Sequence, residues 1–545
     1  MKYLLVLCLL IFADGSSAWR RFFRGRSKDG LGTPNLSRNH TLADDLWFQQ
    51  ELDHFDPTNT QTWHQRYFMN KQFFKPGGPV FIMIGGEGEA SAKWMAEGQW
   101  IEYAKQFRAL CFQLEHRFYG KSHPTHLLLF IDFHCKNDGI VVCEYLLEGK
   151  GFTLNLCFHK HVIYTGPTVL TRPSNIIKHR DLSIKNLVYL TSEQALADLA
   201  YFIEGMTHLH QIPAGTKFIV FGGSYPGSLA AWMRVKYPHL VHGAVSSSGP
   251  LLAKIDFQEY YAVVEDSLKT HCQVCVDSIA AANKQFHAML RHRIGQQDLS
   301  KIFKLCDPLD PAATKKNDIA NLYETIASNF AEVVQYNKDN RNSSKTANVT
   351  IDTICDVLVD EKQGIPIERL GAVNDLLLKA NNETCLDYKY MKMIDELRNV
   401  SWKAESSQGG RQWFYQTCTE FGFFQTSTAR PELFSEMFPV DFFVQQCTDV
   451  FGPRYNIHLL ESSVERSNLL YGGLHIEVSN VVYVHGSIDP WHALGITNSS
   501  NPLTPAIYIN GTAHCANMYP ASPSDLPDLV KARQKVGAII RDWLK

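Results

Sequence analysis

Six short apolar runs, rich in β-branched and aromatic residues, constrain the fold of this chain more than any other feature of its sequence. Short continuous runs of this kind are typical of strands that are buried on both faces of a parallel sheet. Helical patterns lie between them, as after Thr191, which forms a capping box with Gln194. The alternation predicts a doubly wound α/β sheet. The runs are Pro79–Ile84, Ala109–Leu114, Lys217–Phe221, Val241–Val245, Val481–Val484 and Ala506–Ile509.

Residues 256–467 have a different character, with helical patterns, seven cysteines and few strand-like runs. A chain of 545 residues is also too long for one simple core. We therefore expect a helical, disulfide-bearing insertion between the fourth and fifth of these runs, at about the sixth and seventh strands of the complete sheet. It would cap the carboxyl ends of the strands, where α/β proteins bind ligands. The sheet domain would then comprise residues 46–255 and 468–545.

The first 18 residues have the pattern of a secretory signal peptide. Lys2 precedes a short apolar core, and small residues end at Ala18. This core is too short to span a bilayer, and no later stretch is long and apolar enough to do so. Residues 19–45 show no helical or strand period, so we expect a flexible arm or a pro-segment. The prediction is a secreted or lysosomal protein without a membrane partner.

Cysteines and glycosylation sequons agree with the secretory route. The chain has 13 cysteines, of which most are expected to pair in an oxidising compartment. Cys272 and Cys275 are the one pair of cysteines with the close spacing of a metal site. A disulfide is favoured over zinc for these cysteines, because no second pair follows at zinc-site spacing. No metal or cofactor is expected, and a net charge of -2 gives no basic field for nucleic acid. Glycosylation candidates in the insertion are Asn342, Asn348, Asn382 and Asn399, and other sequons begin at Asn35, Asn39, Asn498 and Asn510.

Residues 126–180 fit none of these patterns. They begin with an apolar run and continue without a clear period or turn chemistry, and they carry Cys135, Cys143 and Cys157. Unstructured loops of this length are uncommon in compact domains. The segment is either a genuine atypical insertion or an artefact of how the coding sequence was assembled, and its length favours the artefact.

The segment Phe221–Gly227 (FGGSYPG) is typical of a strand-to-helix turn that carries a nucleophile. The usual form is G-x-S-x-G, in which small residues leave room for a strained backbone and a closely packed helix. Gly222 is present, Ser224 is the candidate nucleophile, and Pro226 replaces the second glycine. Proline is tolerated in the first turn of a helix, where its missing N–H loses no hydrogen bond. The alternative is a turn without a catalytic role.

Candidates for the acid and the base follow the last two predicted strands. In α/β-hydrolases the chain order is Ser, then Asp or Glu, then His, with the last two in loops after late strands. Asp489 follows the fifth run and His514 the sixth. The acid would orient the imidazole, and the imidazole would take the proton from Ser224. His485 and His492 are weaker candidates because neither follows the last strand, and Asp489 has the alternative role of a turn residue.

Further site residues are predicted around this triad. The N–H groups of Tyr225, directly after the nucleophile, and of Gly86, in the glycine-rich loop after the first run, are candidate oxyanion donors. Glu87 in that loop would bind the free amine of a peptide if it points into the site, and is otherwise a solvated carboxylate. Trp491, close to the candidate acid, is a candidate substrate-binding residue.

Several motifs also resemble one known family in their order and residues. They are LDHFDP (52–57), GGEGE (85–89), LEHRFYGKS (114–122), LTSEQALADLAYFI (190–203), FGGSYPGSLAAWMRVKYPHL (221–240), CTEFGFFQT (418–426), HGSIDPWHALG (485–495) and AHC (513–515). The chain resembles the serine peptidases that include lysosomal Pro-Xaa carboxypeptidase, dipeptidyl peptidase II and thymus-specific serine protease, and most of all the thymus-specific branch. The resemblance covers nearly all of the chain from about residue 46, apart from 126–180.

The resemblance implies an α/β-hydrolase domain with a helical, disulfide-bearing cap. It implies the triad named above and an exopeptidase that acts on peptides after proline or small residues. A homodimer is a candidate assembly. Two cysteines depart from the family pattern, Cys111 and Cys515, and are candidates for free thiols. The implied disulfides are Cys418 with Cys447, Cys275 with Cys355 and Cys306 with Cys385.

Two alternatives to an active peptidase remain. A catalytically inactive relative would serve as a binding protein, and an esterase would use the same fold on other substrates. The intact Ser, Asp and His favour the enzyme. The family resemblance favours peptides, because a triad alone does not separate amide from ester substrates.

Overall fold

The computed structural model describes residues 22–27, 30–36, 41–125, 131–135, 141–146, 153–159, 162–163, 181–338 and 349–545. Its centre is an eight-stranded sheet in the order β16-β15-β12-β11-β5-β6-β4-β3. Neighbours from β16 to β6 pair in parallel, and β4 and β3 join antiparallel at one edge. The predicted α/β sheet is confirmed. The strands are β3 (Leu46–Glu51), β4 (Thr62–Asn70), β5 (Val80–Ile84), β6 (Leu110–Leu114), β11 (Phe218–Gly223), β12 (Gly243–Ser247), β15 (Val481–Gly486) and β16 (Ala506–Ile509).

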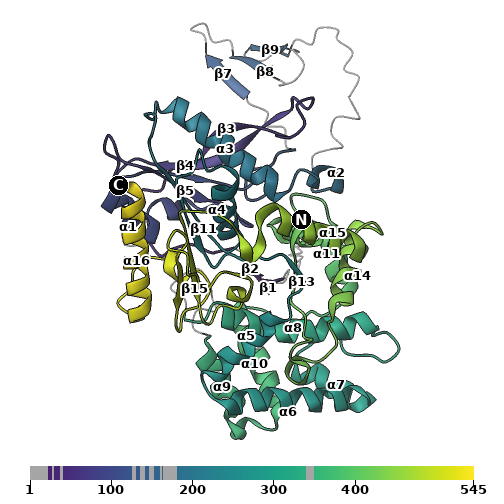
Figure 1. Cartoon of the computed structure of the whole chain (residues 1–545). Helices are drawn as coiled ribbons and strands as arrows, with labels where there is room; N and C mark the ends of the chain where they lie inside the picture. The colour runs from purple at the N-terminus through teal and green to yellow at the C-terminus, as the bar shows by residue number, and fades with distance from the viewer. Residues whose placement is uncertain are drawn as a thin grey trace, which may run out of the picture.

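Helices cover both faces of this sheet (Figure 1). α1 (Gln99–Phe107) and α16 (Pro527–Leu544) lie together on one face, and α3 (Ser192–Leu209) and α4 (Tyr225–Lys236) contact each other on the other. Successive strand side chains point to opposite faces, so each strand contributes to two apolar cores. Phe81 of β5 belongs to the core beneath α1 and α16, and its neighbour Ile82 belongs to the other.

The residues between β12, the sixth strand of the sheet along the chain, and β15, the seventh, are mostly helical. We call this part of the chain the cap. In Figure 1 its helices α5 to α10 lie together at the end of the molecule away from β3. The cap helices are α5 (Glu259–Lys269), α6 (Gln273–Leu290), α7 (Arg293–Ile302), α8 (Lys316–Gln335), α9 (Ile351–Val359), α10 (Pro366–Asn381), α11 (Tyr390–Arg398), α12 (Gly410–Gln416), the π-helix η5 (Thr417–Phe421), α13 (Pro431–Phe434), α14 (Val440–Phe451) and α15 (Ile457–Tyr471).

Three disulfides cross-link the described part of the cap, and they are the pairs that the family resemblance implies. Closing loops of this kind restricts the unfolded chain and so stabilises the fold. The disulfide favoured between Cys272 and Cys275 is not formed, because Cys275 pairs with Cys355 and leaves Cys272 as a free thiol. Cys111 and Cys515 are buried free thiols, as expected. The disulfides join Cys275 to Cys355, Cys306 to Cys385 and Cys418 to Cys447.

The N-terminal arm differs from the flexible segment expected over residues 19–45. Its strands β1 (Phe22–Phe23) and β2 (Arg26–Ser27) form a hairpin, and the side chains of Phe23, Arg24 and Arg26 are buried. Arg24 and Gly25 have φ angles of 56° and 66°, as in the two-residue turns that match the twist of paired strands. Strands of two residues are too short to show a period in the sequence, which is why the hairpin could not be predicted. Its buried side chains indicate that contacts with the rest of the protein stabilise it.

The atypical insertion also differs from the expectation of a segment without regular structure. Its described residues form a separate antiparallel sheet in the order β10-β9-β8-β7, which stands apart from the main sheet in Figure 1. Runs such as VVCEYL and TLNLCFH contain the β-branched and aromatic residues that strands prefer. The strands are β7 (Ile131–Cys135), β8 (Val141–Leu146), β9 (Thr153–His159) and β10 (Val162–Ile163).

Among the described residues, no helix has both the length and the apolar character that a membrane span requires.

Candidate active site

Ser224 occupies a sharp turn between β11 and α4. Its φ of 63° and ψ of -135° lie in a region that non-glycine residues rarely adopt. The glycines around it allow close backbone approach: a Cβ on Gly222 would lie 1.9 Å from the carbonyl oxygen of Pro226, and one on Gly227 would lie 2.6 Å from that of Ser247. The turn therefore presents Ser224 at the carboxyl end of β11 and at the positive N-terminus of α4.

Asp489 and His514 are joined by a buried hydrogen bond of 2.9 Å between Oδ1 and Nδ1. Asp489 lies after β15, and its Oδ1 also accepts from the backbone N–H of Trp491 at 3.1 Å. His514 lies after β16, and its backbone N–H donates to the carbonyl of Gln335 in the cap at 3.0 Å. Contacts within the sheet domain therefore orient Asp489, and the cap in addition holds the backbone of His514.

The pKa values of the buried pair are shifted in opposite directions. Burial by itself lowers the pKa of His514, but attraction to Asp489 and their hydrogen bond outweigh it, and the pKa lies well above its usual value. Burial raises the pKa of Asp489, and the positive imidazole outweighs this effect and keeps the pKa low. The arrangement stabilises an ionised Asp489 and a charged imidazolium, the state that forms when a histidine accepts a proton.

Backbone contacts place the turn of Ser224 next to the loop that carries His514. Its N–H donates to the carbonyl of Ser247 at the end of β12, at 2.9 Å. The next residue, Ser248, accepts at Oγ from the N–H of Cys515 at 2.9 Å. A Cβ on Gly223 would lie 3.0 Å from Cys515 Sγ, so the residue before Ser224 packs against the residue after His514.

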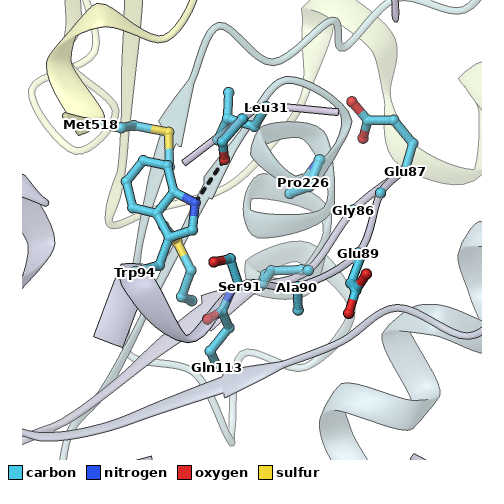
Figure 2. A pocket seen from close by; sticks show the side chains of 16 residues that line it. Leu31, Gly86, Glu87, Glu89, Ala90, Ser91, Trp94, Gln113, Pro226 and Met518 are labelled. Atoms are coloured by element: carbon cyan, nitrogen blue, oxygen red, sulfur yellow. Dashed lines mark hydrogen bonds between the residues drawn. The ribbon is translucent and has the colours of Figure 1, made fainter. Parts of the chain in front are cut away.

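Of the two candidate oxyanion residues, Tyr225 begins the first turn of α4 and Gly86 lies against that turn. A Cβ on Gly86 would lie 2.2 Å from Cγ of Pro226, so the glycine-rich loop after β5 packs directly on that turn. Figure 2 shows Gly86 and Pro226 next to each other at a hollow that Gly223 also lines. Tyr225 is held by its hydroxyl, which contacts His116 Nε2 and accepts from Gln416 Nε2, both at 3.1 Å. These hydrogen bonds fix the residue whose N–H is the candidate donor.

Glu87 is 7% exposed, so the interpretation as a solvated carboxylate is wrong. Burial raises its pKa, and the nearby charges of Arg26 and His514 oppose this only in part. In Figure 2 its carboxyl group points away from the glycine-rich loop. A buried carboxyl group within electrostatic reach of His514 has the chemistry to pair with a cation.

Trp491 and Gln335 form a connection between sheet domain and cap that the sequence patterns do not reveal. Gln335, at the end of α8, is fully buried. Its Oε1 accepts from Trp491 Nε1 at 2.9 Å and from the hydroxyl of Tyr260 at 2.6 Å. Because the carbonyl of Gln335 also holds the N–H of His514, one cap residue supports two loops of the site. No local signal could identify it, since glutamines are common on helices.

The weaker histidine candidates lie outside the hydrogen-bonded pair. His485 is buried, which lowers its pKa to about 4, so the side chain is neutral near pH 7. His492 contacts Tyr508 near the surface. Of the four glycosylation candidates in the cap, Asn382 and Asn399 are exposed, whereas Asn342 and Asn348 lie outside the described residues.

The parallel sheet and the strained turn at Ser224 define an α/β-hydrolase, and the comparisons with known proteins show its family. The pattern of the serine carboxypeptidase S28 family matches residues 50–133 and 177–536, which leaves out most of the insertion. A putative serine protease of Caenorhabditis elegans is 34% identical, over 96% of this chain and 94% of its own. The mouse thymus-specific serine protease is 32% identical, over 92% of this chain and 87% of its own length. Mouse lysosomal Pro-X carboxypeptidase is 25% identical, over 94% of this chain and 93% of its own length.

The chain therefore belongs to the serine carboxypeptidase S28 family and is a serine-type peptidase. The resemblance stated from its motifs is confirmed.

Proposed function

We propose that this protein is an exopeptidase that hydrolyses peptide bonds after proline or small residues, with Ser224 as nucleophile, His514 as base and Asp489 as acid. The observation that carries the proposal is the buried bond between Asp489 and His514 beside a serine in a strained strand-to-helix turn. Strain of this kind persists only where the surrounding structure maintains it, and it is concentrated at functional sites.

The reaction proceeds through an acyl-enzyme. His514 takes the proton of the Ser224 hydroxyl while Oγ attacks the carbonyl carbon of the substrate. The N–H groups of Tyr225 and Gly86 stabilise the negative oxygen of the tetrahedral intermediate. The intermediate collapses as His514 donates its proton to the leaving amine. A water molecule, deprotonated by His514, then cleaves the ester and restores Ser224.

The proposed substrate preference rests on two groups near the candidate triad. Trp491 packs against Phe423 and Phe257 with ring centroids 5.3 Å and 5.4 Å apart, and we propose that this buried aromatic cluster forms the wall that receives a flat, apolar side chain such as proline. Glu87 supplies a buried carboxyl group that can pair with the free amine of a peptide. The name of the mouse lysosomal relative records action on Pro-X bonds, which supports the same preference.

We also propose that the protein enters the secretory pathway, is glycosylated at Asn382 and Asn399, and acts outside the cell or in lysosomes. Both asparagines are exposed, and the cap disulfides are typical of an oxidising compartment.

Fluorophosphonate labelling of the secreted protein tests the triad. We expect the parent to label, Ser224→Ala to lose labelling, and Ser524→Ala, which removes an exposed serine, to label like the parent. An Xaa-Pro aminocoumarin amide and an N-blocked Pro-Phe dipeptide then separate action from the amino end and from the carboxyl end. A folded parent that does not label would identify an inactive relative, and a labelled protein that cleaves only esters would identify an esterase.

A further inference from the structure

The tip of the β1–β2 hairpin lies against the residues that position the acid and the base. The carbonyl of Gly25 accepts from Gln335 Nε2 at 2.9 Å. A Cβ on Gly25 would lie 2.4 Å from Cζ2 of Trp491 and 2.2 Å from Nε2 of Gln425. Since Gln335 also holds His514, the hairpin fills space that borders the triad and the aromatic wall proposed for the substrate.

Arg24, beside that tip, has its guanidinium in a cage of three cap phenylalanines. Its Cζ lies 4.0 Å from the ring centroid of Phe443, 4.9 Å from that of Phe424 and 5.3 Å from that of Phe414. Nη2 donates to Gln446 Oε1 at 2.6 Å, and the side chain is only 3% exposed. Aromatic faces around a desolvated cation are the arrangement by which proteins recognise guanidinium and ammonium groups.

The three phenylalanines of the cage all belong to the cap, and Phe23 of the hairpin packs against one of them, Phe414, with ring centroids 5.8 Å apart. Phe414 lies in α12, Phe424 in the short strand β14 (Gly422–Phe424) and Phe443 in α14. The Cys418–Cys447 disulfide joins the segments that follow Phe414 and Phe443 by four residues each. The disulfide therefore restrains the segments that carry two of the three rings.

Other described residues of the arm also contact loops around the candidate site. Arg26 donates from Nε to the carbonyl of Glu87 at 2.5 Å and from Nη2 to that of Gln408 at 2.7 Å. Farther on, Leu31 accepts from the hydroxyl of Tyr519 at 2.6 Å. Figure 2 shows Leu31 across the hollow from Gly86, so the arm borders the hollow beside the nucleophile. A segment with these contacts occupies the approach that a peptide substrate needs.

We propose that the cage of Phe414, Phe424, Phe443 and Gln446 is a subsite for a positively charged peptide side chain, and that the chain's own hairpin fills it with Arg24 as an intramolecular ligand that blocks the cleft. The proposal rests on the proposed peptidase function for its consequence, since a blocked cleft slows reaction at Ser224. The binding of a cation by the cage is independent of catalysis.

Two variants of the full chain test the blocking. Gly25→Ala places a methyl group against Trp491 at a φ of 66°, and we expect the short hairpin rather than the buried Trp491 to be displaced. Arg24→Gln removes the cation while keeping an amide. We expect both to react with a fluorophosphonate about tenfold faster than the parent, the scale of a buried cation–π contact. Gly77→Ala is the matched control, because it carries the same backbone strain at a φ of 85° with no atom within 4 Å of the new Cβ. Unchanged rates in both folded variants would overturn the blocking.

A peptide tests the subsite itself. The acetylated amide of residues 22–27, labelled with fluorescein, should bind Gly25→Ala at least about tenfold more tightly than the same peptide with glutamine in place of Arg24. It should also slow the labelling of that variant. Equal anisotropy titrations for the two peptides would overturn the cation subsite. If no variant labels at all, the peptidase proposal fails, and the titration still decides the subsite because it requires no reaction.

Discussion

Replacing Gln335 with leucine removes the cap residue that connects Trp491, Tyr260 and the hairpin. The leucine has a similar volume but accepts no hydrogen bond, so two buried donors, Trp491 Nε1 and the Tyr260 hydroxyl, lose their shared acceptor. A buried donor left without a partner costs about 1–3 kcal/mol, which gives about 2–6 kcal/mol for the pair. The backbone bond from His514 to residue 335 stays.

Urea unfolding followed by tryptophan fluorescence measures this loss of stability. The same change should also slow fluorophosphonate labelling by about 10- to 100-fold. A displaced Trp491 no longer holds Asp489 through its backbone N–H, and small misplacements of catalytic groups have effects of this size. Gln445→Leu is the control, since it makes the same substitution at an exposed position of the cap helix α14, where an effect within about 0.5 kcal/mol is expected. Gln335→Leu with the stability and labelling rate of the control would refute the role assigned to this residue.

Three further predictions concern the triad, the oxyanion residues and a buried carboxyl group. Asp489→Asn removes the charge that raises the pKa of His514, so the acid limb of the pH–rate profile should move to lower pH while the maximal hydrolysis rate falls about 10⁴-fold. Gly86→Ala should slow labelling by about 10²-fold or more, because the new methyl group collides with Pro226 and displaces a donor N–H; a rate within twofold of the parent would contradict this. Burial raises the pKa of Glu420 from 4.5 to about 7, so the folded chain keeps a proton that the unfolded chain releases, and stability should fall as pH rises between these values. Glu420→Gln should remove this contribution, on the order of 3 kcal/mol, from the difference between urea unfolding curves at pH 4.5 and pH 8, and an unchanged difference would show that the carboxyl group does not titrate there.

As an intramolecular ligand, the hairpin would give the protein a simple form of control. A cut in the arm, a competing cationic peptide, or changes that weaken its contacts would release it. Each of these acts on the same interface of Arg24 with the cap, so the variants of the hairpin described above also indicate how strongly the arm resists release.

The sequence by itself determined the central sheet and the positions of the candidate triad. A strand that is buried on both faces leaves a continuous apolar run, and the loop after each strand carries the residues that the sheet brings to its carboxyl edge. Ser224, Asp489 and His514 could therefore be selected from their places after successive runs. The edge strands β3 and β4 were missed, because their mixed polar and apolar residues give no continuous run.

Only the tertiary structure decided which distant residues complete the site. Gln335 meets His514 across 179 positions of sequence, and Arg24 meets Gln446 across 422. Contacts of this kind depend on how the cap packs against the sheet domain, and neither partner carries a local pattern that reveals the other. The same physical reason explains the arm: a six-residue hairpin is too short to be stable alone, and it acquires its structure from the cap and the sheet domain against which it packs.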